Sequence, residues 1–380
     1  MAHYLNPAAY PPLLHAAEVL ARAGWQVHLV GTHDGANGTM ETGLDSVDGV
    51  RVTLLPAPTG RASRRALFVR FNARVFALAA RSRPSWLYAS DPLAAPVALA
   101  ARRLLGTRVL YHEHDAPDDH PADLVGRAVA PFRRRLARAA DLVVIPQAER
   151  LRAFVASHRR MRPTHLVWNV PLRRQARPIP RPASQTTPGS AFVLYYHGSL
   201  NAERVPPALV GAMARLPEHV RLRVVGYETV GSRGFRARVM AHANALGVDG
   251  RVLFGAPVSR EALWPECDAA SAGLVLMPLN DASDTNLSSM VGASNKAFDY
   301  LARGLPLVVS DTPAWRDAYV TPGYGVAVDP GSPESIAAQV RALLDAPADA
   351  QRMGEAGRQR VLADWNYETQ FAPVLHALAA

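Results

Sequence analysis

The chain has 380 residues, 49% of them hydrophobic and 19% charged, which suits two domains of ordinary size and excludes wholesale disorder. A formal net charge of +10 raises the question of an anionic partner, but the sequence has no nucleic-acid reader motif and no aromatic–basic interleaving. We therefore expect no nucleic-acid partner. The single cysteine, Cys267, excludes an internal disulfide and a multi-thiolate zinc site, and no apolar run or leader pattern indicates export, so we expect a cytoplasmic protein.

Of the 42 basic residues, only Lys296 is a lysine. The preference for arginine, together with abundant alanine and proline, indicates a GC-rich coding bias and weakens any functional meaning of arginine density. The same bias makes the lysine informative, because a compact ammonium fits where a forked guanidinium does not. Chance is the alternative explanation.

The first half of the chain alternates short β-rich runs with helical patterns, which is typical of a doubly wound parallel sheet. The expected strands are Trp25–Val30, Val50–Leu55, Trp86–Ala89, Arg108–Tyr111, Leu142–Ile145 and Thr164–Trp168. The expected helices are Leu13–Ala23, Arg64–Arg81, Leu93–Leu105 and Ala122–Ala139.

A stretch rich in proline, arginine and small polar residues then interrupts the alternation, which restarts in the second half. The expected strands there are Phe192–His197, Arg221–Gly226, Val252–Phe254, Gly273–Met277, Leu307–Ser310 and Gly325–Val328. The sequence thus predicts an α/β protein of two Rossmann-like domains facing across a cleft that holds the active site. The expected divisions are a first domain at 1–171, a linker at 172–190, a second domain at 191–365 and a C-terminal helix at 366–380 that packs back on the first domain.

The most specific motif is GASNKAFDYLARGLP, Gly292–Pro306, which precedes an apolar strand. Ser294 and Asn295 are favourable N-cap types, and Lys296 and Asp299 follow at helical spacing. The start of this helix would offer backbone N–H groups to a phosphate, while the Asp299 carboxylate could bind ribose hydroxyls. A capped helix without a ligand is the alternative.

This motif resembles the end of the Glu-x7-Glu element of retaining GT-B glycosyltransferases, in particular those of family 4, related to glycosyl transferases group 1. The resemblance implies that Asp299 binds the nucleotide ribose. The first acid of the element falls on Val291, where this chain departs from the family. Ser294, Asn295 and Lys296 are expected to take over part of its role.

The segment HGSLNAERV resembles the family's Gly-Arg-Leu-x-x-Glu-Lys-Gly loop, whose basic residues hold the donor diphosphate. Gly198 matches, Ser199 replaces the arginine, and Arg204 replaces the lysine. Arg204 would bind phosphate, with Lys296 or Arg303 supplying the second charge, and a solvated arginine is the alternative. Further along, Tyr227 and Glu228 end a predicted strand where the family contacts the nucleotide base, although either could be a turn residue.

The loop YHEHDAPDDH, Tyr111–His120, follows a predicted strand in the first half. The family often carries a histidine here that faces the acceptor, which makes His114, or else His112, the candidate, with Asp115 orienting it. Metal binding and an exposed polar loop are the alternatives.

Together these features predict a retaining glycosyltransferase that moves a sugar from a nucleoside diphosphate sugar to an acceptor hydroxyl, with His114, Arg204 and Lys296 as catalytic residues. Cofactors and metal are not expected, because the basic residues and the helix start supply positive charge. The product could be a bacterial polysaccharide, a glycolipid or a glycosylated metabolite. A GT-B epimerase and a non-catalytic nucleotide-sugar-binding subunit are the rival interpretations.

The basic amphipathic stretch Gly126–Asp141 suggests peripheral contact with the inner face of an anionic membrane, with a solvated helix as the alternative.

Overall fold

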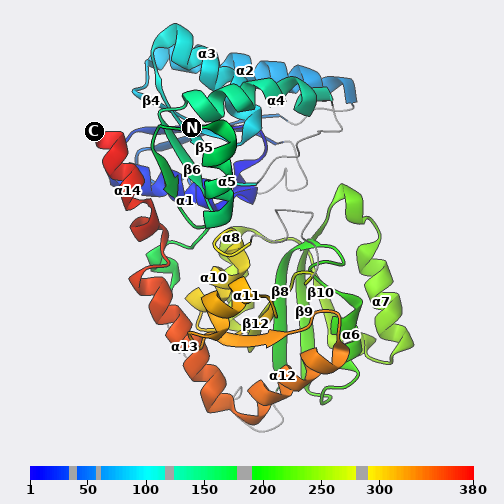
Figure 1. The fold of residues 1–380 in the computed structure, drawn as a ribbon. Coiled ribbons are helices and arrows are strands. Elements are labelled where there is room, and N and C mark those ends of the chain that lie inside the picture. Colours follow the sequence, from blue (N-terminus) through cyan, green and yellow to red (C-terminus); the bar gives the residue numbers. More distant parts are fainter. Residues whose placement is uncertain (34–40, 57–60, 116–123, 178–190, 280–289) are drawn as a thin grey trace. The chain divides into compact units, whose positions relative to one another are not determined.

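The structure is a computed structural model that describes residues 1–33, 41–56, 61–115, 124–177, 191–279 and 290–380. It divides into two compact units, which we call unit 1 (Met1–Asn169 with Tyr367–Ala380) and unit 2 (Val170–Asn366). Figure 1 shows the elements of both units. Residues 178–190 of the expected linker lie outside the described residues.

The first residues of the expected linker are not extended chain. Arg173–Gln175 form a short 3-10 helix, and Leu172 and Ala176 are buried within unit 2. Gln175 bonds this segment together, because its side-chain oxygen accepts a hydrogen bond of 2.9 Å from the Leu172 N–H. Residues 172–177, the first part of the expected linker, therefore fold with unit 2.

Unit 1 is built on a parallel seven-stranded sheet, sheet A, in the order β3-β2-β1-β4-β5-β6-β7. Its strands are β1 (Ala2–His3), β2 (Val27–Thr32), β3 (Val50–Leu55), β4 (Trp86–Ser90), β5 (Arg108–His112), β6 (Leu142–Ile145) and β7 (Thr164–Leu166). Its helices are α1 (Pro11–Arg22), α2 (Arg61–Ser82), α3 (Ala95–Leu105), α4 (Leu124–Ala139), α5 (Ala148–His158) and α14 (Tyr367–Ala379).

The helices of unit 1 form two layers around sheet A. Helices α2, α3 and α4 lie together on one face, and α1 and α14 lie on the other (Figure 1). Helix α14 is tied to this unit by Trp86, whose Nε1 donates to the Leu378 carbonyl at 3.0 Å, and by an edge contact between the rings of His15 and Tyr367. Both faces of the sheet are thus covered, as a parallel sheet requires.

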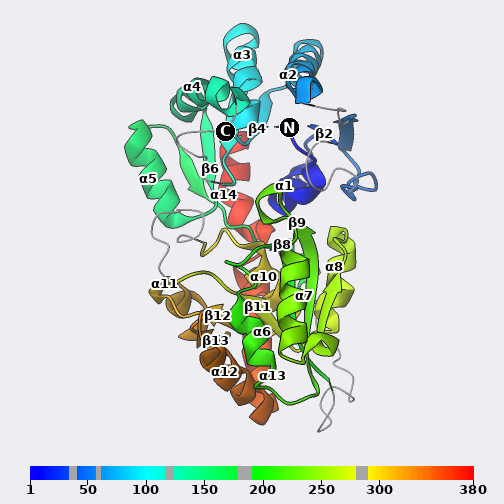
Figure 2. The same cartoon turned by 90° about the vertical axis from the view of Figure 1, so that its right-hand side faces the viewer.

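Unit 2 contains a parallel six-stranded sheet, sheet B, in the order β10-β9-β8-β11-β12-β13. Its strands are β8 (Phe192–Leu200), β9 (Val220–Glu228), β10 (Val252–Gly255), β11 (Ala272–Val275), β12 (Leu307–Ser310) and β13 (Gly325–Val328). Its helices are α6 (Pro207–Met213), α7 (Phe235–Ala245), α8 (Arg260–Asp268), α10 (Asn295–Ala302), α11 (Pro313–Trp315), α12 (Pro333–Asp345) and α13 (Pro347–Ala363). Figure 2 shows α6, α7 and α12 beside this sheet from a second direction.

Two doubly wound parallel sheets confirm the predicted fold class. The differences are local. Strand β1 has only two residues, too few for a periodic pattern, and α5 carries few buried apolar residues, so neither is predicted. Strand β8 runs three residues beyond its predicted end, because Gly198, Ser199 and Leu200 continue to pair with β9.

Candidate functional site

The core of the candidate site in unit 2 is helix α10, which packs very closely on sheet B. Phe298, Tyr300 and Leu301 are fully buried. The Tyr300 ring lies against the backbone of β11 at Gly273, where a Cβ atom would come within 2.2 Å of the ring. The hydroxyl of Tyr300 in turn accepts a hydrogen bond of 3.1 Å from the His197 N–H in β8. These contacts fix α10 against β11 and the last part of β8.

Lys296, in that first turn, lies directly over Gly198 of β8. A Cβ atom at Gly198 would be 2.7 Å from Lys296 Cε and 3.0 Å from Nζ, and the glycine has a φ of 126°, which side-chain-bearing residues rarely adopt. Nζ also lies 5.5 Å from the centre of the Tyr196 ring. Burial and, to a smaller extent, the charge of Arg204 lower the pKa of Lys296 to about 7, and Asp299 acts in the opposite direction. The structure therefore holds an easily deprotonated amine where the sequence predicts a phosphate-binding cation.

Asp299 lies one turn further along α10 and is 1% exposed. Arg260, at the start of α8, pairs with it through both guanidinium nitrogens; Nη1 donates to Oδ2 at 2.6 Å, and Nη2 donates to Oδ1. His197 Nε2 is 3.5 Å from Oδ2, and burial lowers the pKa of this histidine well below its usual value, so the ring is neutral. Replacing Asp299 would leave Arg260 as an unpaired buried cation, which is strongly destabilising.

The remaining residues of the predicted donor site surround the start of α10 and the end of β8. Ser294 is the N-cap of α10, as predicted, but makes no side-chain capping bond; its buried Oγ has no hydrogen-bond partner among the described residues. Asn295 is the first residue of the helix. Arg204 follows β8 in a turn, where its N–H donates to the Asn201 side chain at 3.1 Å and its Nη1 contacts the Met277 sulfur.

Two further predicted donor residues lie at the end of β9. Tyr227 is half-buried there. The Glu228 carboxylate accepts hydrogen bonds from the N–H groups of Gly234 at 2.7 Å and Arg236 at 2.8 Å, and these bonds lower its pKa. Glu228 therefore caps the start of α7, which leaves Tyr227 as the better candidate for a base contact.

In unit 1 the carboxyl ends of β1, β4 and β5 bring three imidazoles together. Ser90 links two of them, because its hydroxyl oxygen lies 2.9 Å from His3 Nδ1 and 3.0 Å from His114 Nε2. The rings of His112 and His114 lie 3.9 Å apart, and the Tyr88 hydroxyl hydrogen-bonds His112 Nδ1. A hydroxyl with one proton can donate to only one of its two histidines, so Ser90 couples the tautomers of His3 and His114.

These three histidines are neutral at ordinary pH. Each is 3% exposed or less, and burial lowers the pKa of His3 and His112 to about 3 and that of His114 well below its usual value. The opposite ring nitrogens, His3 Nε2, His112 Nε2 and His114 Nδ1, have no hydrogen-bond partner within the described ranges. Uncharged ring nitrogens without partners are suited to hydrogen-bonding a polar ligand such as a sugar hydroxyl.

The ring and the backbone of His114 have separate partners. Ser90 holds the ring, and Asp115, the expected orienting residue, is exposed. The backbone of His114 is fixed by Asp91, whose Oδ1 accepts its N–H at 2.9 Å, and by Arg150, which donates to its carbonyl at 3.0 Å. Asp91 has a φ of 65°, a costly conformation for a residue other than glycine, and its N–H donates to the His112 carbonyl at 2.9 Å.

For the metal alternative, no group of three or more His, Cys, Asp or Glu residues suited to a metal ion occurs among the residues that the structure describes. Residues 116–120 of the predicted loop lie outside that part of the chain. Glu113, an acid of the same loop, is engaged elsewhere: Arg133 donates to both of its oxygens at 2.8 Å.

Several residues at these positions were not singled out from the sequence, among them His3, Ser90, Asp91, Arg150, His197 and Arg260. Arg150 and Arg260 give no signal in a chain with so many arginines. Ser90 and Asp91 follow a predicted strand, and His197 ends another, beside Gly198. Their position at the carboxyl ends of predicted strands was the signal by which they could have been identified.

Comparison with protein families and curated proteins gives matches in both halves of the chain. Residues 12–169 match a family described as a glycosyl transferase 4-like domain, and residues 204–376 match a family described as glycosyl transferase-like. A curated glycogen synthase of Mycobacterium tuberculosis is 38% identical over 73 residues, which span 19% of this chain and 18% of that protein.

Among solved structures, sucrose-phosphate synthase from Thermosynechococcus elongatus is similar, with a TM-score of 0.74, 18% identity and coverage of 99% of this chain and 98% of that one. HepE from Anabaena, solved with UDP-glucose, has a TM-score of 0.73, 16% identity and the same coverage. At these identities the likeness is one of fold.

The low pKa of Lys296 predicts a pH-dependent cost to stability. The unfolded chain keeps this lysine protonated up to about pH 10.4, whereas the folded protein begins to release the proton near pH 7, so stability rises with pH between these values. Lys296→Met should therefore raise the free energy of unfolding by roughly 1–3 kcal/mol at pH 6.5, and the gain should shrink towards pH 10. Urea unfolding at both pH values measures it, with the exposed Arg352→Met as the control variant. An equal gain at the two pH values would contradict the placement of this charge.

Proposed function

Because the chain belongs to the GT-B glycosyltransferases of group 1, we propose that it moves a sugar, with retention at the anomeric carbon, from a nucleoside diphosphate sugar to an acceptor hydroxyl. The observation that carries the donor side is the Lys296 amine, held over Gly198 at the start of α10. Arg204 lies near enough to lower the pKa of this amine, so the two form a cationic seat for a diphosphate. Anabaena HepE, similar in fold, was solved with UDP-glucose, which makes that nucleotide sugar the first donor to test.

The contacts of Asp299 argue against its use as a protein nucleophile. Its carboxylate is buried and paired with both guanidinium nitrogens of Arg260, so it is poorly placed to attack an anomeric carbon. In the proposed reaction the departing diphosphate oxygen takes the proton of the acceptor hydroxyl on the same face of the sugar. The protein then positions the two substrates and stabilises the charge that develops on the diphosphate.

Asp299 also remains the proposed ribose contact. A carboxylate has about four lone pairs, of which Arg260 uses two, so Asp299 keeps acceptor capacity for ribose hydroxyls, although its carboxylate is buried in this structure. Gly198, Ser199, Ser294 and Asn295 would surround the diphosphate with backbone and side-chain donors, and Tyr227 would contact the base. We propose that no divalent metal takes part, since Lys296 and Arg204 supply the charge.

Donor binding tests this proposal through proton uptake. A bound diphosphate should raise the pKa of Lys296, so binding of UDP at pH 8 should take up a fraction of a proton, up to about one. Calorimetry in buffers of different ionisation enthalpy measures the uptake. Lys296→Met should abolish it and weaken UDP binding by about tenfold or more, whereas Arg352→Met should do neither.

The same preparation separates the rival functions. With EDTA present, the protein should release UDP from UDP-glucose when a hydroxyl acceptor is supplied. If EDTA abolishes the release of UDP and Mn²⁺ or Mg²⁺ restores it, metal independence is contradicted. Binding of UDP-glucose without turnover on any acceptor would favour the binding-subunit alternative, and release of a free epimer would favour the epimerase.

On the acceptor side we propose His114 as the residue that contacts the incoming hydroxyl or the transferred sugar. His114→Ala should lower turnover by about a hundredfold, as loss of a positioned catalytic group does, with little change in UDP affinity, because the proposed diphosphate seat belongs to unit 2. His376→Ala, on the exposed side of α14, is the matched control. Unchanged turnover in His114→Ala would remove this histidine from the mechanism and leave His112 as the candidate.

We further propose that helix α4 makes peripheral contact with an anionic membrane, which favours a lipid-linked acceptor over a free metabolite. Three exposed arginines of α4, Arg134, Arg135 and Arg138, line a pocket of about 520 Å³ together with Arg102 and Arg162, which both pair with Asp141. The helix contains no acidic residue. Exposed apolar side chains, Leu104, Phe132 and Met161, are carried by the same segments. Arginines that can bind headgroup phosphates, next to exposed apolar side chains, are typical of a membrane-surface site. None of the described helices is both long enough and apolar enough to span a bilayer.

Vesicle flotation tests this contact. The protein should float with vesicles of 30% phosphatidylglycerol at low salt and detach at high salt, because screening lengths fall from about 30 Å at 0.01 M to about 3 Å at 1 M. Replacing Arg134, Arg135 and Arg138 by glutamate should abolish flotation. The control is the same change at three exposed arginines of α12 and α13: Arg341, Arg352 and Arg360. Absence of flotation at low salt would contradict the membrane contact and favour a water-soluble acceptor.

A further inference from the structure

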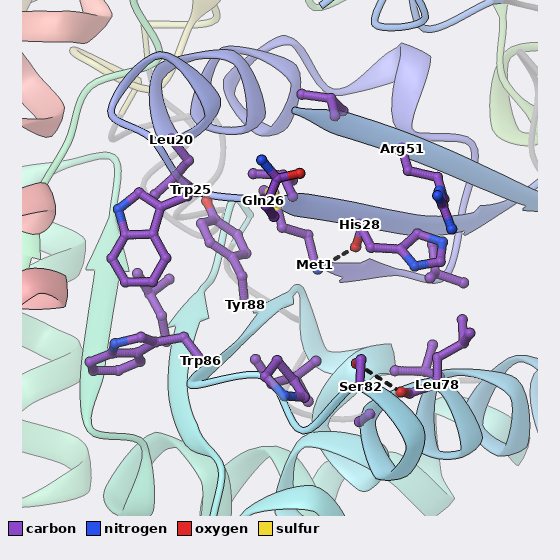
Figure 3. A pocket seen from close by; sticks show the side chains of 18 of the residues that line it. Met1, Leu20, Trp25, Gln26, His28, Arg51, Leu78, Ser82, Trp86 and Tyr88 are labelled. Atoms are coloured by element: carbon purple, nitrogen blue, oxygen red, sulfur yellow. Dashed lines mark hydrogen bonds between the residues drawn. The ribbon is translucent and has the colours of Figure 1, made fainter. Parts of the chain in front are cut away.

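Ser90 lies at the centre of the histidine cluster of unit 1, because the register of sheet A places it between β1 and β5. Its Cα partners in these strands are His3 and His112. Alternate side chains of a strand share a face, so Ser90 follows Trp86 and Tyr88, which line a cavity of about 590 Å³ further back along the sheet (Figure 3). The side chain of Ser90 is fully buried, which keeps its hydroxyl away from solvent.

The hydroxyl of Ser90 has one proton and meets two ring nitrogens. These are His3 Nδ1 at 2.9 Å and His114 Nε2 at 3.0 Å. Burial lowers the pKa of both rings, so each ring is neutral and carries a single proton on one of its two nitrogens. If Ser90 donates to one ring, it must accept from the other. Two arrangements satisfy this condition, and they differ in whether the proton of His114 lies on Nδ1 or on Nε2.

The backbone beside His3 distinguishes the two arrangements. A hydrogen-bond contact with the Ser90 backbone acts to raise the pKa of His3, against the larger effect of burial. Only an acceptor, the carbonyl, stabilises a protonated nitrogen in this way. His3 Nε2 has no hydrogen-bond partner among the described residues, so the contact belongs to Nδ1. The proton of His3 therefore lies on Nδ1.

Asp91 acts in the same direction while it is ionised. Its Oδ2 lies 3.9 Å from His3 Nδ1, too far for a hydrogen bond but close enough for its charge to favour a proton there. Burial raises the pKa of Asp91 well above its usual value, which weakens this contribution. The Ser90 carbonyl is therefore the stronger of the two arguments.

A proton on His3 Nδ1 sets the direction of the whole chain of hydrogen bonds. His3 Nδ1–H donates to Ser90 Oγ, so the Ser90 hydroxyl donates to His114 Nε2. The proton of His114 then lies on Nδ1, the nitrogen that has no partner in the described part of the chain. The opposite direction would turn the lone pair of His3 Nδ1 towards the Ser90 carbonyl, which leaves two buried acceptors facing each other.

We propose that Ser90 is a positioning residue that holds His114 as a hydrogen-bond donor, through Nδ1–H, to an oxygen of the acceptor or of the transferred sugar. This inference rests on the proposed function. An N–H group binds the lone pair of a hydroxyl, ring or glycosidic oxygen, and it cannot take up a proton at the same nitrogen. His114 thus binds an oxygen and leaves the proton of the acceptor hydroxyl to the departing diphosphate.

Nitrogen NMR of the ligand-free protein tests the direction of the chain. The ¹⁵N shift of a ring nitrogen shows whether it carries a proton, and the signals of His114 are those, among the 13 labelled histidines, that His114→Ala removes. In the wild type at neutral pH, Nδ1 of His114 should carry the proton. Ser90→Ala removes the donor to Nε2, so the two shifts of His114 should move towards each other as both tautomers become populated. His3→Asn offers an amide N–H in place of Nδ1–H and should keep the wild-type tautomer.

Ser157→Ala in α5 is the matched control, because it also removes a hydroxyl 2.9 Å from a histidine nitrogen, here Nδ1 of His158. It should leave the His114 signals unchanged. A wild-type proton on Nε2 of His114 would overturn the proposal, and this spectrum needs no variant of Ser90 to fold. The same tautomer of His114 in the wild type and in Ser90→Ala would overturn it as well.

Turnover tests the link to the reaction. Ser90→Ala should lower turnover of UDP-glucose by about tenfold, the effect of one ordinary hydrogen bond, and leave UDP affinity unchanged, whereas Ser157→Ala should change neither. Wild-type turnover in Ser90→Ala would overturn the positioning role. The NMR measurement requires no substrate, so absence of sugar transfer by the wild type would contradict the proposed function and not the direction of the hydrogen bonds.

Discussion

The close approach of α10 to sheet B is the constraint on which the candidate donor site depends. Tyr300 can reach the backbone of β11 only because position 273 is glycine, and the end of the Lys296 side chain lies where a Cβ atom at position 198 would be. The hydrogen bond from the His197 N–H to the Tyr300 hydroxyl then joins helix and strand at the same point. A helix set further from the sheet would leave the lysine in solvent, with an ordinary pKa and no fixed place for its charge.

The polar groups at the carboxyl ends of the two sheets differ in charge. In unit 2 a buried ion pair, Arg260 with Asp299, lies under an amine that burial has made easy to deprotonate. In unit 1 the corresponding edge holds uncharged imidazoles linked through the Ser90 hydroxyl. Cations suit an anionic leaving group, and neutral ring nitrogens suit hydroxyls, so each edge is matched to one of the two substrates in the proposed reaction.

Arginine serves three purposes in this chain that its composition does not distinguish. Arg260 and the half-buried Arg133 are partners of carboxylates, Arg150 holds a loop backbone, and Arg134, Arg135 and Arg138 of α4 form an exposed cluster. Burial and partner decide among these roles. An exposed cluster without acids on its own helix keeps its charge for an outside partner, whereas a paired arginine does not.

The sequence by itself determined the fold class, because alternating apolar runs and helical periods leave few options other than doubly wound parallel sheets. It also determined the start of α10, since Ser294 and the spacing of Lys296 and Asp299 are local signals. Only the tertiary structure decided which groups those residues meet. The Arg260 partner of Asp299 is 39 residues away, Ser90 and His114 come from different segments, and Glu228 is used by α7. Such pairings follow from strand register and helix packing, which bring distant residues together in ways that no local pattern records.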